Sequence, residues 1–255
     1  MKFLRLLHLA QIAIWLACSC MAQPSIAQEI KVVTEELPPF SMTQSGRVTG
    51  LSTEVVRAVL KEAGLNASIQ SVPWARAYDL AANTPNVLIY SISRTSEREK
   101  LFKWVGVIAP THWYLFAMAN RPLHIQKLSD ARNFQIGTIN EDVGEQYLKA
   151  NGFTVGKNIQ SSNEHKLIYE KLKLGRIDFW ISDEISAFYL VRSAGEDPAK
   201  TLTRSLPLPE LDGSEEGMEM AFGAKTPDET VQRFRRAFAE IQLQGIYAQI
   251  LKNWH

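Results

Sequence analysis

The stretch that decides the fold is VLIYSISRTSEREKLFKW, residues 87–104. It opens with a short apolar run behind the turn signal Pro85-Asn86, which is typical of a buried β-strand. The run ends in the hydroxyls of Ser91 and Ser93, and Arg98 follows. We expect the strand to deliver Arg98 to the start of a short helix. Hydroxyls at a strand end beside a guanidinium suit a small carboxylate, whereas the simpler interpretation is an exposed arginine on a polar loop.

The rest of the chain alternates strand-like and helix-like segments, which is typical of an α/β protein. Strands are expected at residues 29–34, 67–72, 87–93, 113–119, 134–138, 179–182 and 218–223. Helices are expected at residues 52–63, 75–82, 143–150, 164–174 and 184–194, and from 227 onward. The last long helix begins at Thr226-Pro227-Asp228-Glu229, which has the pattern of a capping box with proline at the first helical position.

Two changes in composition predict that the chain passes between two lobes and back. The first is the apolar run that ends at Asn120-Arg121-Pro122, and the second is the proline-rich, acidic loop 207–217. We expect a signal peptide at 1–27, a first lobe at 28–117, a second lobe at 118–218 and a return segment of the first lobe at 219–255. Such a double crossover indicates a hinged clamshell.

The N-terminus has the order of a secretory signal peptide: basic residues, an apolar segment, then small residues. Lys2 and Arg5 precede the apolar residues 9–22, and Ser25-Ile26-Ala27 follows. The apolar segment is shorter than the roughly 20 residues that span a membrane. We therefore expect cleavage after Ala27 and a periplasmic protein. Lipidation at Cys18 or Cys20 is the alternative, although neither follows the usual leucine of a lipobox.

Composition excludes several classes of function. The 255 residues are 45% hydrophobic and 22% charged with a formal charge of +1, so nothing indicates a nucleic acid or an anionic membrane as partner. Both cysteines lie in the predicted signal peptide, which excludes disulfides and thiol catalysis from the mature chain. The remaining histidines are far apart, so we expect no metal and no other cofactor.

The motif around Thr95-x-x-Arg98 resembles the carboxylate-binding motif of the family 3 periplasmic solute-binding proteins. The resemblance continues in chain order through residues 35–40 (EELPPF), Gly50-Leu51 and residues 178–183 (DFWISD). It covers essentially the whole chain after the predicted signal peptide. It implies a type II periplasmic-binding-protein clamshell of two α/β lobes with two crossover hinge strands, as in the amino-acid-binding components of ABC transporters.

Ligands of open α/β sheets bind at the carboxyl ends of strands. Residues that follow predicted strands therefore make up the expected ligand site, namely Glu36, Trp74, Arg76, Ser91, Ser93, Arg98, Asp142, Val143 and Asp183. The resemblance implies that Arg98 holds a ligand carboxylate and Asp183 its ammonium. It also implies that Trp74 lies against the ligand, with Tyr90 and Trp113 as further aromatic candidates.

Each assignment has a plainer alternative: Asp183 as a helix cap, Trp74 as core packing, Arg76 as a brace for an acidic neighbour and Glu36 as a solvated side chain. The chain also departs from the family pattern at two places. Ser91 stands where glycine is usual, and residues 139–143 (INEDV) replace a basic residue followed by Ser-Gly-Thr. Asp142 would repel a bound carboxylate unless it pairs with Arg98 or Arg94.

These patterns predict a monomeric periplasmic protein that captures a small polar ligand by hinge closure. The ligand is expected to be an amino acid or a related compound, such as a derivative, a polyamine or a short peptide. Delivery would be to an ABC permease or to a sensor. The alternative is a dehydratase resembling cyclohexadienyl dehydratase, with acid–base pairs among Glu35, Glu36, Asp142 and Asp183. Without a nucleophile motif or a histidine-paired base, we expect no catalytic residues.

Overall fold

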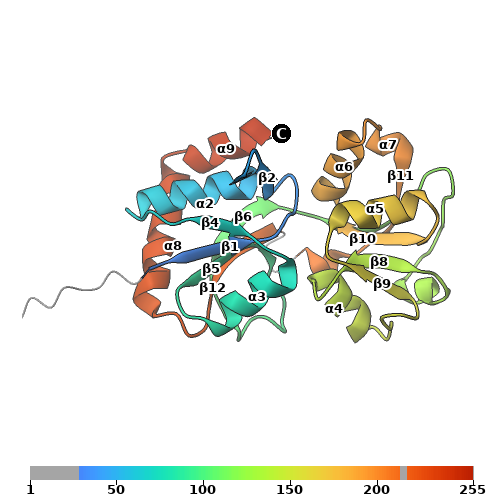
Figure 1. The fold of residues 1–255 in the computed structure, drawn as a ribbon, viewed down its shortest axis with the longest axis horizontal. Helices are drawn as coiled ribbons and strands as arrows, with labels where there is room; N and C mark the ends of the chain where they lie inside the picture. Colours follow the sequence, from blue (N-terminus) through green and yellow to red (C-terminus); the bar gives the residue numbers. More distant parts are fainter. Residues whose placement is uncertain (1–28, 213–216, 255) are drawn as a thin grey trace, which may run out of the picture.

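The structure, a computed structural model, describes residues 29–212 and 217–254. It consists of two lobes, each built on its own five-stranded sheet and joined by extended segments (Figure 1). The predicted signal peptide at 1–27, with both lipidation candidates, lies outside the described residues. Over the ranges described, no helix combines the length and the apolar character needed to cross a membrane.

The first lobe is a mixed sheet with helices on both faces. Its strands, in spatial order, are β4 (Ile69–Ser71), β1 (Lys31–Thr34), β5 (Val87–Ser93), β12 (Gly217–Gly223) and β6 (Phe102–Pro110). Its helices are α2 (Leu51–Glu62), α3 (Trp74–Asn83), α8 (Asp228–Leu243) and α9 (Ile246–Trp254). Side chains alternate between the two faces of a strand. Val32 and Leu88 accordingly pack in the cluster with α2 and α8, and their neighbours Val33 and Ile89 pack with α3.

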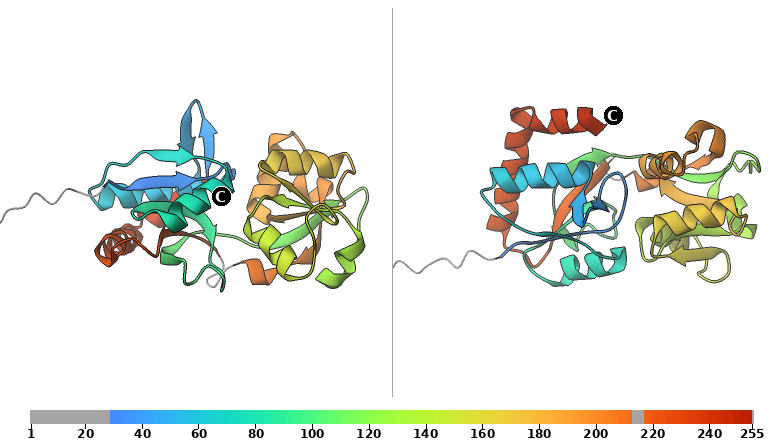
Figure 2. Two further views of the ribbon diagram at one scale, coloured as in Figure 1. Left: turned by 60° about the horizontal axis from the view of Figure 1, so that its bottom comes forward. Right: turned by 45° about the horizontal axis from the view of Figure 1, so that its top comes forward.

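The second lobe has the same layered construction. Its strands, in spatial order, are β11 (Leu202–Pro207), β7 (Trp113–Met118), β10 (Phe179–Asp183), β8 (Ile136–Ile139) and β9 (Ile159–Ser162). Its helices are α4 (Val143–Ala150), α5 (His165–Lys173), α6 (Glu184–Ser193) and the short α7 (Pro198–Thr201), with the 3₁₀ turns η2 (Leu128–Asn133) and η3 (Pro209–Leu211). A hairpin of β2 (Met42–Gln44) and β3 (Arg47–Thr49) projects from the first lobe (Figure 2).

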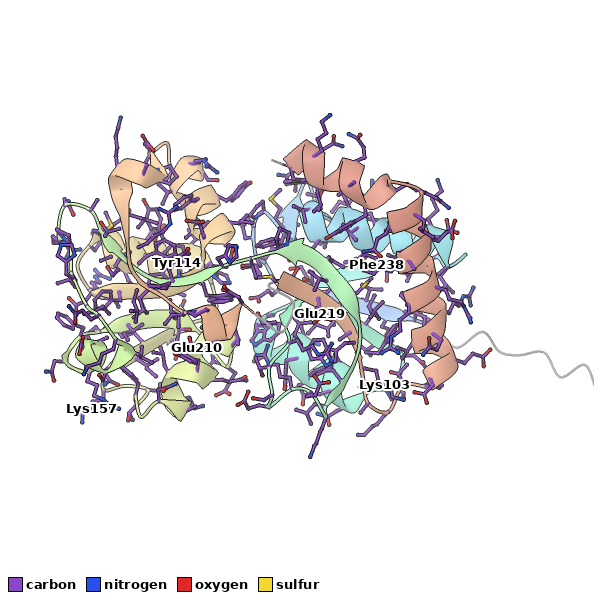
Figure 3. All side chains as sticks on the ribbon, turned by 180° about the vertical axis from the view of Figure 1, so that it is seen from behind. Lys103, Tyr114, Lys157, Glu210, Glu219 and Phe238 are labelled. Carbon is purple, nitrogen blue, oxygen red and sulfur yellow. The ribbon has the colours of Figure 1, made fainter. Side chains whose placement is uncertain are left out.

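The chain first crosses between the lobes at residues 111–112, and not after residue 117 as the sequence predicted. β6 ends in the first sheet, whereas β7 is hydrogen-bonded antiparallel to β10 and β11 of the second. The apolar pattern of residues 113–119 indicated a strand but carries no information about its partners. In the view from behind, Tyr114 on β7 lies in the second lobe and Glu219 on β12 lies in the first (Figure 3).

The short helix predicted after the motif strand is wrong. Residues 96–101 form successive turns, in which Arg98 N donates to Thr95 O (3.1 Å) and Leu101 N to Arg98 O (3.0 Å). These bonds span three residues, whereas an α-helix needs bonds that span four. The chain then enters β6 at Phe102, which the sequence analysis did not identify as a strand.

The predicted capping box at residue 226 is also wrong. α8 begins at Asp228, but its N-cap residue is Pro227, which has no side-chain oxygen to accept a bond. The Thr226 hydroxyl instead accepts a hydrogen bond from the Asn86 backbone N–H (2.9 Å), just before β5. This threonine therefore ties the return segment to the first sheet.

Candidate functional site

Arg98 is the central cation of the site and is 1% exposed. Its Nη1 donates to the backbone oxygen of Ser93 (3.0 Å) in its own lobe, and its Nη2 donates to Gln146 Oε1 (3.1 Å) in the second lobe. The guanidinium also lies over the rings of Trp74 and Tyr78, at 5.2 and 5.3 Å from their centroids. Packing and hydrogen bonds thus fix the orientation of the fork of donors.

Ser91 stands at a β-bulge at the cleft end of β5. Its neighbours Tyr90 and Ile92 pair with Met220 and Glu219, so Ser91 is the extra residue. Its φ is 60°, a left-handed conformation that disfavours residues with a Cβ, which fits the usual glycine at this position. The bulge turns the Ser91 hydroxyl toward the cleft, where it is buried without a hydrogen-bond partner in the described structure.

Asp142 faces Arg98 from the second lobe but caps α4. Its Oδ1 accepts bonds from Glu145 N (2.7 Å) and Thr138 Oγ1 (2.9 Å). Burial raises the pKa of Asp142 to about 7 in spite of these bonds. Arg94, one of the two pairing partners considered for Asp142, instead pairs with Glu99 (2.7 Å) and lies 3.9 Å from Glu219. The charges of Asp142 and Arg98 interact, but in the described structure the two side chains do not form an ion pair at contact distance.

Asp183 combines the two interpretations that the sequence left open. Its Oδ1 accepts a bond from Ser186 N (2.8 Å) and caps α6. Its Oδ2 is buried and has no hydrogen-bond partner in the described part of the chain. Burial raises the pKa of Asp183 to about 6, and the nearby His165 opposes this rise. One oxygen therefore caps the helix, and the other has its hydrogen-bonding capacity unused among the described residues.

An ion pair crosses the cleft between His165 at the start of α5 and Glu35 after β1. The His165 Nε2 lies 3.6 Å from Glu35 Oε2, and both side chains are buried. Two hydrogen bonds also join the lobes: Trp74 Nε1 donates to Glu141 O (2.9 Å), and the Tyr189 hydroxyl donates to Met42 Sδ (3.3 Å). With the bond from Arg98 to Gln146, these contacts hold the lobes closed.

The closed lobes leave a cavity of about 20 Å³ around Arg98. That volume is enough for about one water molecule, so a larger ligand needs the lobes to open. Wider grooves of about 490 and 650 Å³ lie on either side of it. The residues that line the central cavity are Glu35, Leu37, Trp74, Ser91, Ser93, Arg98, Trp113, Asp142, Val143, His165 and Met218.

The structure thus brings together six of the nine residues proposed from the sequence: Trp74, Ser91, Ser93, Arg98, Asp142 and Val143. The other three are placed differently. Glu36 is exposed in the groove of about 490 Å³, the outer groove, and accepts bonds from the backbone and hydroxyl of Thr43. Arg76 is exposed on α3, and Asp183 is buried, both outside the lining of the central cavity. Tyr90 is buried and bonded to Thr53 (2.9 Å).

The proposed set omitted five residues that line the cavity. Trp113 and Met218 stand near the beginnings of antiparallel strands, so a search for strand carboxyl ends does not find them. Trp113 was expected only as an aromatic candidate from the family resemblance, and Met218 was not expected. His165 follows β9, a short polar strand that the sequence analysis did not predict. Glu35 and Glu36 both follow the first strand, and the expected site contains Glu36 in place of Glu35; the apolar Leu37 has no polar group to mark it as a site residue. Within the described residues, no group of three His, Cys, Asp or Glu side chains could hold a metal ion.

Two α/β lobes that close on a buried, charged cleft define a type II periplasmic binding protein. Solved structures agree with this fold. A histidine kinase sensor domain similar to periplasmic binding proteins has a TM-score of 0.77 at 18% identity, with 89% of this chain and 96% of that chain covered. The arginine-, lysine-, histidine-binding protein ArtJ of Geobacillus stearothermophilus has a TM-score of 0.72 at 20% identity, covering 89% and 95%.

The family model for bacterial extracellular solute-binding proteins, family 3, matches residues 30–255, and the chain belongs to this family. Among curated relatives, the arginine-binding extracellular protein ArtP of Bacillus subtilis is 22% identical, covering 99% of this chain and 97% of the relative. The L-cystine-binding protein TcyJ of Escherichia coli is also 22% identical, covering 85% and 78%.

Proposed function

We propose that this protein binds an amino acid or a closely related compound outside the cytoplasm by closing its two lobes. The observation that carries the proposal is the buried guanidinium of Arg98, held between the lobes with its Nε free of hydrogen bonds in the described structure. Arginine recognises carboxylates with two parallel bonds. Asp183 Oδ2, in the second lobe, supplies an acceptor suited to an ammonium group.

Closure would follow from binding to both lobes. A ligand on Arg98 gains contacts with the second lobe only when the lobes close, and this differential affinity favours the closed state. The named relatives bind arginine and cystine, which supports an amino-acid-like ligand. Their extracellular family supports a periplasmic location. We propose further that the protein is a monomer and serves an ABC permease or a sensor.

A thermal-shift screen of amino acids, polyamines and dipeptides against the protein without its first 27 residues tests the proposal. A ligand at 100 times its dissociation constant stabilises the folded state by about 2.7 kcal/mol. We expect at least one amino acid or close relative to raise the melting temperature. Stabilisation by polyamines alone would contradict a carboxylate role for Arg98.

We also propose that the protein releases its ligand unchanged. The relatives are named as binding proteins, which supports this view. Incubation with prephenate and with arogenate, followed by chromatography, tests it. We expect no loss of either compound, whereas turnover would favour the dehydratase alternative.

A further inference from the structure

The ion pair between His165 and Glu35 lies at the boundary between two spaces. Both residues line the central cavity around Arg98, and both also line the outer groove of about 490 Å³. The other charged residues that line this groove are Glu36, Glu164 and Lys166. A ligand whose carboxylate lies on Arg98 therefore has to pass the ion pair if its side chain extends into the groove.

His165 is the second buried cation of the cleft. Neither of its ring nitrogens has a hydrogen-bond partner in the described structure, so the pairing with Glu35 at 3.6 Å is the contact that holds it. The charged groups that face it come from four other elements: Glu35 after β1, Asp142 before α4, Asp183 before α6 and Arg98 after β5. On its own helix, Glu164 and Lys166 are its neighbours.

The surrounding carboxylates favour the charged imidazole. Burial lowers the pKa of His165, but Glu35 first and then Asp142 and Asp183 outweigh burial and raise it above its ordinary value. Because an unperturbed histidine titrates just below neutral pH, this rise moves the change of charge of His165 upward from there. Charged His165 neutralises Glu35, whereas neutral His165 leaves the Glu35 carboxylate without this ion-pair partner, although the charge of Arg98 still acts on it.

We propose that His165 is a specificity-determining residue, a resident cation whose charge decides which amino-acid side chains the cleft accepts. The inference rests on the proposed amino-acid binding and assigns selection of the side chain to one position. With His165 charged, Glu35 is occupied, and neutral or anionic side chains fit beside the pair. With His165 neutral, Glu35 and the acidic groove attract a cationic side chain. Binding of such a side chain is therefore coupled to release of the His165 proton to solvent.

Isothermal titration with L-arginine and L-glutamine tests the coupling. The two ligands share their α-ammonium and α-carboxylate, so titration of Asp142 or Asp183 against those groups affects both alike. In wild type, we expect the affinity ratio of arginine to glutamine to rise by at least about tenfold from about pH 5.5 to about pH 8, since displacement of one proton changes affinity about tenfold per pH unit below the pKa of the group. In His165→Gln, the ratio should change less than about twofold.

His124→Gln is the matched control, because His124 is exposed in the second lobe. It should retain the pH dependence of wild type. If His165 has only a structural role, His165→Gln should change the affinities for both ligands together and leave the pH dependence of their ratio in place. That result would overturn the inference. Binding of both ligands with a pH-independent ratio in wild type would overturn it too, while leaving amino-acid binding intact.

A second measurement needs no ligand. We expect the His165 pKa, followed by NMR of the histidine ring nitrogens, to fall in Glu35→Gln relative to wild type, because the pairing carboxylate is gone. An unchanged pKa would overturn the inference whichever ligand binds. Failure of both amino acids to bind at either pH would count against the proposed function and, with it, against selection of their side chains.

Discussion

Trp74 of the first lobe donates its indole N–H to the backbone oxygen of Glu141 in the second lobe, over 2.9 Å. Glu141 presents that oxygen from a left-handed backbone with a φ of 58°. The same oxygen accepts a bond from Gln146 Nε2 (3.0 Å), and Gln146 in turn accepts one from Arg98. Trp74 therefore packs against the guanidinium and also bonds to the loop that closes over it.

Trp74→Phe should weaken ligand binding by about 1 kcal/mol, roughly fivefold, because it removes this bond and keeps an aromatic ring. Isothermal titration with the ligand found in the screen measures the loss. Trp74→Leu also removes the ring that lies over Arg98 and should lose more. Equal affinity of Trp74→Phe and wild type would show that the indole bond does not favour closure.

Arg98→Lys should cost much of the affinity although the charge remains, by roughly 1.5–3 kcal/mol. A lysine ammonium cannot make the two parallel bonds of the guanidinium. Arg98→Ala should cost more, and titration of both variants measures the series. Arg76→Lys is the matched comparison, because Arg76 is exposed on α3 and should bind like wild type. If Arg76→Lys loses affinity and Arg98→Lys keeps it, the carboxylate role belongs to Arg76.

Periodicity along the chain was sufficient to predict the elements that bury one continuous face. The strand that carries Ser91 and the helix 143–150 were both expected where β5 and α4 lie. Strand pairing was not predictable from such patterns, because a strand has the same alternation whichever sheet it joins. β7 was therefore assigned to the first lobe, although its hydrogen bonds are to β10 and β11.

The same limit explains which site residues were missed. The rule that ligands lie at carboxyl ends holds for parallel strands, but Trp113 and Met218 reach the cavity from the first and second residues of antiparallel strands. Glu35 and Glu36 lie side by side in the sequence, and only the local backbone decides that Glu35 faces the central cavity while Glu36 faces the outer groove.

Asp142→Asn should raise stability at neutral pH relative to wild type. Burial raises the pKa of Asp142 from 3.8 to about 7, so the folded state keeps a proton that the unfolded state releases. Stability of wild type should thus fall as pH rises from about 4 to about 7, and the advantage of the variant should grow over this range. Urea unfolding across pH without ligand measures the difference.

Asp197→Asn is the control for this pH dependence. Asp197 caps α7 through a bond from Ala199 N (3.1 Å), as Asp142 caps α4, but its side chain is 51% exposed. Asparagine substitutes well at an N-cap, so both variants keep their caps. We expect Asp197→Asn to follow wild type at every pH. An advantage of Asp142→Asn that did not vary with pH would contradict the buried-carboxylate explanation.

Ser91→Gly should match or exceed wild type in stability. A left-handed conformation costs a residue with a Cβ roughly 1–2 kcal/mol, and glycine loses about 0.5–1 kcal/mol of that gain through chain entropy. Ser91→Ala keeps the strain and removes the hydroxyl, so it separates the two effects. Thermal unfolding measures both variants. If Ser91→Gly is less stable than Ser91→Ala, the strain at φ 60° is not a significant cost.

Asp183→Asn separates the two oxygens of this carboxylate. Asparagine can accept the bond from Ser186 N through its own oxygen, so the cap on α6 and the melting temperature without ligand should hold. The buried Oδ2 becomes an amide nitrogen, which donates a hydrogen and repels an ammonium. Affinity for an ammonium-bearing ligand should therefore fall by roughly 1.5–3 kcal/mol, as measured by titration.

The outcome distinguishes the two roles, because each leaves a different signature. Loss of affinity with an unchanged melting temperature assigns Oδ2 to the ligand, whereas unchanged affinity leaves Asp183 as a cap alone. Asp183→Ala removes both oxygens and should lower the melting temperature as well, since an N-cap contributes about 1 kcal/mol. Because Asp183 lies outside the lining of the closed cavity, its contact with a ligand requires the lobes to reclose around that ligand in a different arrangement.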